Sequence, residues 1–379
     1  MRADDVMPSG LPTPVAPLRS PARRLLRSGL LEALAAPHGV DRYLELLDPT
    51  RSLRDPPAEL IAARRQTVDS VTMTLRPSDG WRGFRAGQFI QLTIEIAGVL
   101  ETRSYSLACG EQAEGQVEIT VKAHPAGKVS RYLNEHARPG MVVGMSDADG
   151  DFVLPRERPE RLLLISSGSG ITPVMSMLRT LCGEGHGGTV TFLHYARTAE
   201  DVVYRRELAA IAACHPNVRI ALGHTREATA GHLAGHISRE HLRRVVADHR
   251  RARTYVCGAP GLIAWVRDTW AEDGIEQLLH VESFLPPSFT VGDAGAEGSV
   301  DFARSGARVP SDGGPLLEQA ERAGLCPEFG CRMGICRICT CRKTAGSVRN
   351  VLSGEVSGAE EEDIQICVSV PLGDVELAL

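Results

Sequence analysis

Residues 326–341 read CPEFGCRMGICRICTC, and one more cysteine, Cys367, follows before the chain ends. The protein has 10 cysteines, and six of them lie between Cys326 and Cys367. A disulfide-stapled protein would be shorter and would spread its cysteines more evenly. The clustering of cysteines near the end of a long chain therefore indicates ligation of a metal ion or a metal–sulfur cluster.

The spacing C-x4-C-x2-C followed by a distant cysteine is the pattern of a plant-type [2Fe–2S] site. Only one register satisfies it, with the ligands Cys331, Cys336, Cys339 and Cys367. A register that begins at Cys326 places Gly334 at the third ligand position, and one that begins at Cys336 places Thr344 there. Cys326 and Cys341 are therefore predicted not to bind iron.

Thiolate sulfur is the ligand that iron–sulfide clusters prefer. Gly330 and Gly334 let the backbone wrap closely, so that its N–H groups can point at the sulfurs. A zinc site is the alternative, but it would favour two short C-x2-C pairs or added histidines, and no histidine follows His280. Together with Gly346-x-Val348, the segment resembles the plant-type ferredoxins over about 80 residues. This resemblance implies an α+β unit of the β-grasp type.

The composition of the 379 residues excludes several classes of protein. Hydrophobic residues make up 43% and charged residues 23%, which is typical of a folded, globular chain. The net charge of −5 argues against a nucleic-acid partner. The sequence contains no run of about 18 apolar residues, the length that a bilayer-spanning helix needs. The opening MRADDVMPSG lacks the apolar core of a secretory signal. We expect a cytoplasmic protein without a transmembrane segment.

Residues 1–57 form an N-terminal extension that is predicted to be partly helical. Within 22–36, leucines recur at helical spacing beside Arg23, Arg24 and Arg27. One interpretation is a helix docked on the protein's own surface. The other is a basic amphipathic helix that touches a membrane surface or a membrane-bound partner. The sequence leaves both open.

Three folded units follow, so the fold class is multidomain. Residues 58–157 contain short alternating runs, such as 70–75 and 89–94, separated by Gly and Pro, which indicates a small antiparallel β-barrel. In residues 158–284, strand-like runs alternate with helical patterns, as in an α/β domain with a parallel sheet. Residues 285–298 are rich in Pro, Gly and Ala and are predicted to link this domain to the last unit, 299–379.

The first unit contains two motifs that suit a flavin. One comprises Arg103, Ser104, Tyr105 and Ser106, in which an Arg can pair with a pyrophosphate, a Tyr can lie against a flat ring and a small hydroxyl can reach a ring nitrogen. The other comprises Gly127, Lys128, Val129 and Ser130, which open a short helix whose N-terminus suits phosphate. In this order they resemble the flavin domain of the ferredoxin–NADP reductase family. The second motif favours FAD over FMN.

The second unit begins with the strand-to-helix stretch LLLISSGSGITPV, residues 162–174. Its glycines allow a tight turn and close approach to a diphosphate at the helix N-terminus. The stretch is not G-x-G-x-x-G, because Pro173 stands at the third glycine's place. It resembles the pyridine-nucleotide motif of the same family, and Cys257-Gly258 resembles the element that lies beside the nicotinamide. The implied nucleotide-binding residues are Gly168, Ser169, Gly170, Thr172, Pro173, Cys257 and Gly258.

The ends of two predicted strands decide between NADPH and NADH. Both carry an arginine, Arg197 and Arg226, which suits a 2′-phosphate better than a ribose hydroxyl. Thr225-Arg226 also resembles the family's Ser-Arg pair that holds this phosphate. The prediction is therefore NADPH, while Asp201 and Glu227 nearby keep NADH as the alternative.

The family resemblance covers about residues 58–284 and implies an NADPH-dependent oxidoreductase. Hydride passes from NADPH to FAD, and single electrons pass on to the [2Fe–2S] cluster. Ser106 and Cys257 are implied to line the hydride path as catalytic residues. The segment Glu282-Ser283-Phe284 is implied to close over the flavin.

No Rieske cysteine–histidine pairing, histidine box or haem motif occurs in the sequence. The order FAD, NADP, ferredoxin resembles reductases that feed oxygenases, hydroxylases or membrane acyl-CoA desaturases. The extension, with Asp41-Arg42-Tyr43-Leu44, most resembles actinobacterial reductases paired with acyl-CoA desaturases, which implies fatty acid desaturation and a peripheral membrane contact. A stand-alone flavin or quinone reductase and a redox sensor are the alternatives.

Overall fold

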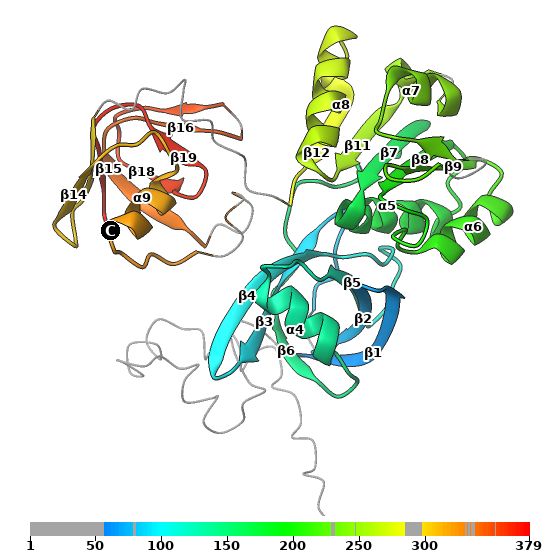
Figure 1. The fold of residues 1–379 in the computed structure, drawn as a ribbon, viewed down its shortest axis with the longest axis horizontal. Helices are drawn as coiled ribbons and strands as arrows, with labels where there is room; N and C mark the ends of the chain where they lie inside the picture. Colours follow the sequence, from blue (N-terminus) through cyan, green and yellow to red (C-terminus); the bar gives the residue numbers. More distant parts are fainter. Residues whose placement is uncertain are drawn as a thin grey trace, which may run out of the picture.

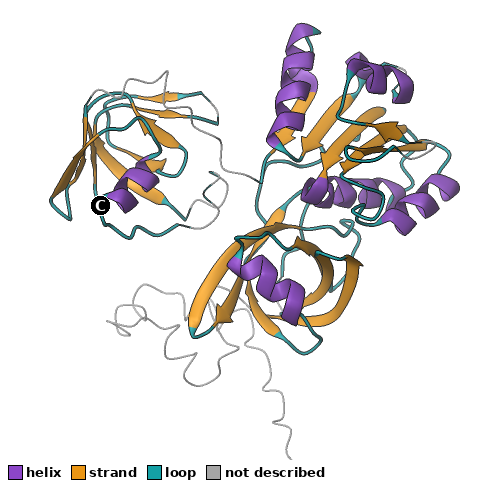
Figure 2. Ribbon diagram, in the orientation of Figure 1, coloured by secondary structure: helices purple, strands orange, loops and turns teal. Residues whose placement is uncertain are grey.

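The computed structural model describes residues 57–78, 81–228, 232–246, 248–284, 298–329, 332, 334, 338–352 and 354–379. Figure 1 traces the chain through three groups of elements, and Figure 2 shows that the first and third are mostly strands while the second alternates strands and helices. The predicted N-terminal helix, the predicted linker except Gly298, and the predicted ligands Cys331 and Cys336 lie outside the described residues.

The first group is an antiparallel β-barrel, as predicted. Its strands are β1 (Pro57–Thr67), β2 (Ser70–Pro77), β3 (Phe89–Ile96), β4 (Val99–Ser106), β5 (Val117–Lys122) and β6 (Val142–Met145). They run in the order β4-β3-β6-β1-β2-β5, and a bridge between Leu107 and Ile119 joins the two ends. Helix α4 (Lys128–His136) buries Val129 and Leu133 in the barrel core.

The second group is a parallel sheet with helices on both faces, which confirms the α/β prediction. Its strands are β7 (Arg161–Ser167), β8 (Thr189–Ala196), β9 (Val218–His224), β10 (Leu233–Ala234), β11 (Arg253–Cys257) and β12 (Leu279–Glu282), in the order β10-β9-β8-β7-β11-β12. Its helices are α5 (Ile171–Gly183), α6 (Arg205–Cys214), α7 (Arg239–Val245) and α8 (Pro260–Glu272), with short 3-10 turns η1 (Gly168–Gly170), η2 (His249–Arg251) and η3 (Glu276–Leu278).

The alternation of side chains along β7 divides the core of this sheet into two layers. Leu162 and Leu164 pack with α5 and α6, whereas Leu163 and Ile165 pack with α7 and α8. Both layers are fully apolar at this strand, which is why β7 reads as one continuous hydrophobic run. The strand therefore sits at the centre of the sheet, and its carboxyl end leads directly into the glycine-rich turn.

Helix α5 fixes the barrel against the parallel sheet. The Arg179 guanidinium pairs with Glu118 on β5 at 2.6 Å and with Glu207 on α6 at 2.7 Å. The Ser176 hydroxyl donates a hydrogen bond to the carbonyl of Cys109, 2.6 Å away, just beyond the end of β4. These contacts hold the N-terminus of α5 facing the end of β4, where the predicted flavin motif lies.

The third group is an α+β unit, as predicted. A mixed sheet runs in the order β14-β13-β20-β15-β18 and contains β13 (Ser299–Phe302), β14 (Ala307–Pro310), β15 (Thr340–Ala345), β18 (Glu362–Gln365) and β20 (Val375–Leu377). A smaller sheet contains β16 (Val348–Asn350), β17 (Val356–Ser357) and β19 (Ser369–Pro371). Helix α9 (Leu316–Arg322) packs on the core beside β13 and β19.

A buried lysine anchors the turn before β16 and the connection between β17 and β18 in this unit. Lys343 on β15 is 0% exposed, and its ammonium donates hydrogen bonds to the carbonyls of Gly346, Gly358 and Glu360 at 2.9, 2.7 and 2.5 Å. Three carbonyl acceptors satisfy the three N–H donors of the ammonium, which makes its burial tolerable. The connection is thereby held against the sheet that continues from the cysteine-rich loop.

Candidate functional site

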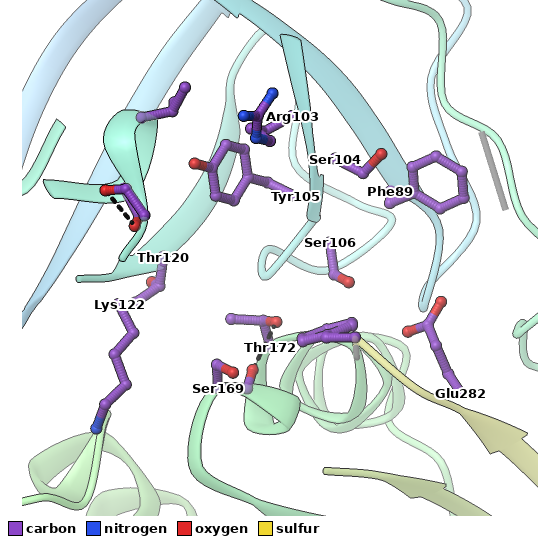
Figure 3. Close-up of a pocket in the computed structure, with 14 residues that line it drawn as sticks. Phe89, Arg103, Ser104, Tyr105, Ser106, Thr120, Lys122, Ser169, Thr172 and Glu282 are labelled. Carbon is purple, nitrogen blue, oxygen red and sulfur yellow. Dashed lines mark hydrogen bonds between the residues drawn. The ribbon is translucent and has the colours of Figure 1, made fainter. Parts of the chain in front are cut away.

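A cavity of about 270 Å³ opens between the barrel and the parallel sheet. Its walls come from β3, β4 and β5, from the start of α4, from the glycine-rich turn, and from the end of β12 and the segment after it. The lining residues are Phe89, Arg103, Ser104, Tyr105, Ser106, Thr120, Lys122, Gly127, Val129, Ser130, Ser169, Thr172, Glu282 and Phe284. Figure 3 shows them converging from both domains. The structure thus brings together both predicted flavin motifs and part of the predicted nucleotide motif.

Ser106 ends β4 and is 5% exposed. Its hydroxyl has no hydrogen-bond partner among the described residues, and in Figure 3 it points toward the side of the cavity where Thr172 and Glu282 lie. A buried hydroxyl without a partner costs free energy, so such a group usually serves a ligand. A flat ring with a polar edge, such as a flavin, fits this position.

The cavity corner beside α4 suits phosphate. Gly127 is the N-cap of α4, no side chain caps the helix, and its first turn contains no acidic residue. The free N–H groups and the positive end of the helix dipole therefore face the cavity. Arg103 adds a guanidinium from β4, and Lys128 adds an ammonium from the first turn of α4, although Lys128 is not among the lining residues. This corner can bind a diphosphate.

The glycine-rich turn brings two strand ends into contact. A Cβ atom at Gly170 would lie 2.3 Å from the carbonyl oxygen of Cys257, so only glycine fits there. Ser169 and Thr172 reach the cavity from this turn, and the Thr172 hydroxyl donates to the Ser169 carbonyl at 3.1 Å. The predicted residues Gly168, Gly170, Pro173 and Gly258 shape the turn without lining the cavity. Their predicted role in nucleotide binding stays a prediction.

Cys257 and Glu282 are register partners on β11 and β12. The thiol lies 4.0 Å from a carboxylate oxygen of Glu282, and burial holds the pKa of Cys257 well above its usual value. Burial also raises the pKa of Glu282 to about 8, so both groups are neutral at pH 7. Glu282 lines the cavity, whereas Cys257 lies behind it. The predicted catalytic role of Cys257 therefore stays a prediction.

The sequence does not single out all of the lining residues, and it marks Glu282 only as part of the predicted closing segment. Phe89, Thr120 and Lys122 belong to ordinary barrel strands, and their sequence neighbourhoods carry no motif. They reach the cavity only because the barrel closes next to the end of β4. Phe284 was predicted to cover the flavin, and it does line the cavity.

The two arginines predicted to bind a 2′-phosphate follow adjacent strand ends, and the Arg226 amide donates to the Arg197 carbonyl at 2.9 Å. The Arg197 guanidinium already pairs with Asp69 at 3.6 Å and with Asp201 at 3.4 Å. The Arg226 side chain is exposed and forms no ion pair with any described residue. Of the two, Arg226 is therefore the better placed to receive an anion. The Thr225 hydroxyl donates to the Ala196 carbonyl at 3.4 Å.

Two of the four predicted cluster ligands are described. Cys339 and Cys367 are 3% and 4% exposed and belong to the same core. The Gly334 amide donates to the Cys367 sulfur at 3.3 Å, and its positive φ of 71° is a conformation that favours glycine. Cys326, predicted to have no ligand role, is exposed, and Cys341 is half-buried.

No described helix is long and apolar enough to cross a membrane.

Three family models match successive parts of the chain. They are described as an oxidoreductase FAD-binding domain at residues 61–153, an oxidoreductase NAD-binding domain at 164–268 and a 2Fe-2S iron-sulfur cluster binding domain at 301–372. The first two contain all the cavity-lining residues except Glu282 and Phe284, which follow the second matched range. The third contains all four predicted cluster ligands.

Relatives match over most of the chain. A protein of Mycobacterium tuberculosis named NADPH oxidoreductase is 36% identical over 371 residues, which cover 97% of this chain and 95% of the relative. The ferredoxin reductase component of 3-ketosteroid-9-alpha-monooxygenase from the same species is 31% identical over 307 residues, 77% of this chain and 84% of the relative. The solved structure of phthalate dioxygenase reductase shares the fold, with a TM-score of 0.58 and 22% identity over 86% of this chain and 98% of that one.

Proposed function

The chain belongs to the ferredoxin–NADP reductase superfamily, in the group with a C-terminal [2Fe–2S] domain, and is an oxidoreductase that uses FAD, NAD(P)H and a [2Fe–2S] cluster. From this premise we propose that it transfers electrons from NADPH through FAD and the cluster to a separate oxygenase, hydroxylase or acyl-CoA desaturase. The observation that carries the proposal is the unpartnered Ser106 hydroxyl, held in a cavity that both reductase domains build.

Different residues of the cavity are proposed to hold different parts of the flavin. Ser106 would hydrogen-bond the polar edge of the ring, Tyr105 and Phe284 would flank it, and Arg103, Lys128 and the N-terminus of α4 would hold the phosphates. When bound, FAD supplies the ability to accept two electrons together and release them singly. The side chains bind and orient the ring and exclude water from one side of it.

Glu282 forms part of the opposite wall, with Cys257 behind it, and the nicotinamide is proposed to enter on this side. Because the pKa of Glu282 is raised to about 8, its carboxyl holds a proton at pH 7 and can donate a hydrogen bond into the cavity. The neutral Cys257 thiol behind it adds no charge to this wall. Both groups would thus keep this wall uncharged at the place where the nicotinamide is proposed to meet the flavin.

The choice of NADPH over NADH rests on Arg226. Its guanidinium is exposed at the carboxyl edge of the sheet and is not used by any described carboxylate, so it is available for a 2′-phosphate. Glu227, one of the two carboxylates that would favour NADH, instead accepts the Ala199 amide at 2.7 Å and lies 3.5 Å from His224. The other, Asp201, lies 3.4 Å from the Arg197 guanidinium. A carboxylate engaged in this way is less available to a ribose hydroxyl.

Relatives support an oxygenase-type acceptor, because several are named as reductases of glycine betaine monooxygenase and one is named as part of 1,2-phenylacetyl-CoA epoxidase. The narrower proposal of an acyl-CoA desaturase, with contact to the membrane, rests on the extension at residues 1–57 alone. Reconstitution tests both. The full chain, NADPH and an oxygenase or desaturase captured with the chain from a cell extract should turn over substrate together. Neither protein should do so alone. Full product formation by a cluster-free variant would overturn the proposed route through the cluster.

A further inference from the structure

Three charged side chains meet at the phosphate corner of the flavin cavity. A carboxylate oxygen of Glu101 lies 2.8 Å from the Lys128 ammonium, and the other lies 3.3 Å from the Arg103 guanidinium. The Glu101 side chain is 18% exposed, whereas those of Arg103 and Lys128 are 41% and 49% exposed. The carboxylate is thus the inner member of the cluster, and both cations are turned toward it.

The strand holds Glu101 in this place. It is the register partner of Ile94 in the β3–β4 ladder, so its backbone is fixed by the sheet rather than by a loop. Side chains alternate along a strand, so Glu101 and Arg103 lie on the same face of β4 as Tyr105. Arg103 has a second anchor, because its guanidinium also donates to the Thr102 carbonyl at 2.7 Å. Arg103 therefore does not depend on Glu101 alone for its position.

The charges here are unusual for a phosphate site. Without Glu101, the corner would present two cations and an uncapped helix N-terminus, a combination that attracts any small anion. The carboxylate reduces this to one net positive charge. The hydrogen bond from Lys128 lowers the pKa of Glu101, so the charge is present at pH 7. The flavin diphosphate must then compete with, or displace, a carboxylate that the protein itself supplies.

We propose that Glu101 is an internal counter-anion of the flavin phosphate site, which limits the affinity for FAD and keeps inorganic phosphate from occupying Arg103 and Lys128. It is a specificity-determining residue, since a small anion gains only the two cations, whereas FAD also gains the ring contacts around Ser106. The inference rests on the proposed placement of the flavin phosphates at this corner.

The test measures FAD binding to apoprotein by quenching of flavin fluorescence, in the full chain. Glu101→Gln removes the charge and keeps the shape. We expect its Kd for FAD to fall about tenfold, because one negative charge next to the bound diphosphate is lost. Inorganic phosphate, added at matched ionic strength, should weaken FAD binding to the variant and leave the wild type nearly unaffected. Glu59→Gln, which breaks an exposed pair with Arg76 on the same barrel, is the matched control and should change neither value.

Two further variants keep the outcome decisive. Glu101→Ala should also tighten FAD binding, and Lys128→Gln combined with Glu101→Gln should reduce the gain, because one of the two released cations is then gone. Weaker FAD binding by folded Glu101→Gln, or an equal change in Glu59→Gln, would overturn the inference and make Glu101 an orienting residue for Arg103. If Arg103→Gln and Lys128→Gln leave FAD binding unchanged, the proposed placement of the phosphates fails instead.

Discussion

The flavin cavity and the cysteine-rich loop are built in opposite ways. The cavity collects single residues from β3, β4, β5, α4, the glycine-rich turn and the end of β12, which are far apart in the chain. The predicted cluster ligands lie within nine consecutive residues, 331–339, plus Cys367. A site of the first kind depends on how two domains pack, whereas a site of the second kind depends on local spacing. The comparison predicts that the cluster can be lost without the flavin, and that the flavin site works without the cluster.

The largest effect is expected at the cluster. Changing any of Cys331, Cys336, Cys339 or Cys367 to Ala should abolish the visible absorption of the [2Fe–2S] centre, because a thiolate ligand is lost. Flavin absorption should stay at one FAD per chain, since the cavity shares no residue with the loop. Cys341→Ala and Cys326→Ala are the controls and should keep the cluster. Loss of the cluster in Cys341→Ala together with its retention in Cys339→Ala would reverse the assignment.

Removal of the whole third unit sharpens the comparison. A chain that ends near Pro286 keeps every residue of the cavity. It should bind FAD and reduce ferricyanide with NADPH, because a two-electron flavin can serve a small acceptor directly. Its rate with cytochrome c should fall by about tenfold or more, since a bulky one-electron acceptor is expected to take electrons from the cluster. Equal cytochrome c rates in the long and short chains would show that the cluster is not the exit.

The proposed 2′-phosphate site offers a third test, because its residues lie close together in space but apart in the sequence. Arg226→Ala should raise the KM for NADPH by about 10- to 100-fold, because it removes a charge-assisted phosphate contact that contributes about 1.5–3 kcal/mol. The KM for NADH and the kcat should change little, because the contact is remote from the nicotinamide.

Arg197→Ala is the matched comparison for this change. It should have a smaller effect, because Arg197 is already paired with Asp69 and Asp201. A wild type that prefers NADH, or an Arg226 variant that weakens both nucleotides equally, would contradict the assignment of Arg226.

The smallest effect concerns the proton on Glu282. Its folded-state pKa of about 8 lies above the unfolded value of 4.5, so the native state binds more protons between these values. The free energy of unfolding of the apoprotein should therefore fall as pH rises from about 5 to about 8, because the unfolded state releases this proton at a lower pH than the native state does. Glu282→Gln should remove this slope in urea titrations at several pH values. An unchanged slope would mean that another group titrates in this range.

The sequence alone determined the order of the units and the chemistry of each. Alternating short runs specified the barrel, strand–helix alternation specified the parallel sheet, and cysteine spacing specified one cluster register, because these signals depend only on local periodicity and spacing. Arg103, Tyr105, Ser106, Gly127 and Ser130 could be singled out because their motifs resemble those of the flavin domain of the ferredoxin–NADP reductase family. They lie in two short motifs, and the structure brings both motifs to one cavity.

The tertiary structure decided what surrounds these motifs. Phe89, Thr120 and Lys122 carry no motif and reach the cavity only through barrel closure. Glu282 acquires its raised pKa only because β12 lies beside β11 and buries the carboxyl. Glu101 lies two residues before a predicted motif, yet nothing in the sequence indicates that its carboxylate faces both Arg103 and Lys128. Burial, desolvation and charge neutralisation depend on neighbours distant in the chain, and only packing brings those neighbours together.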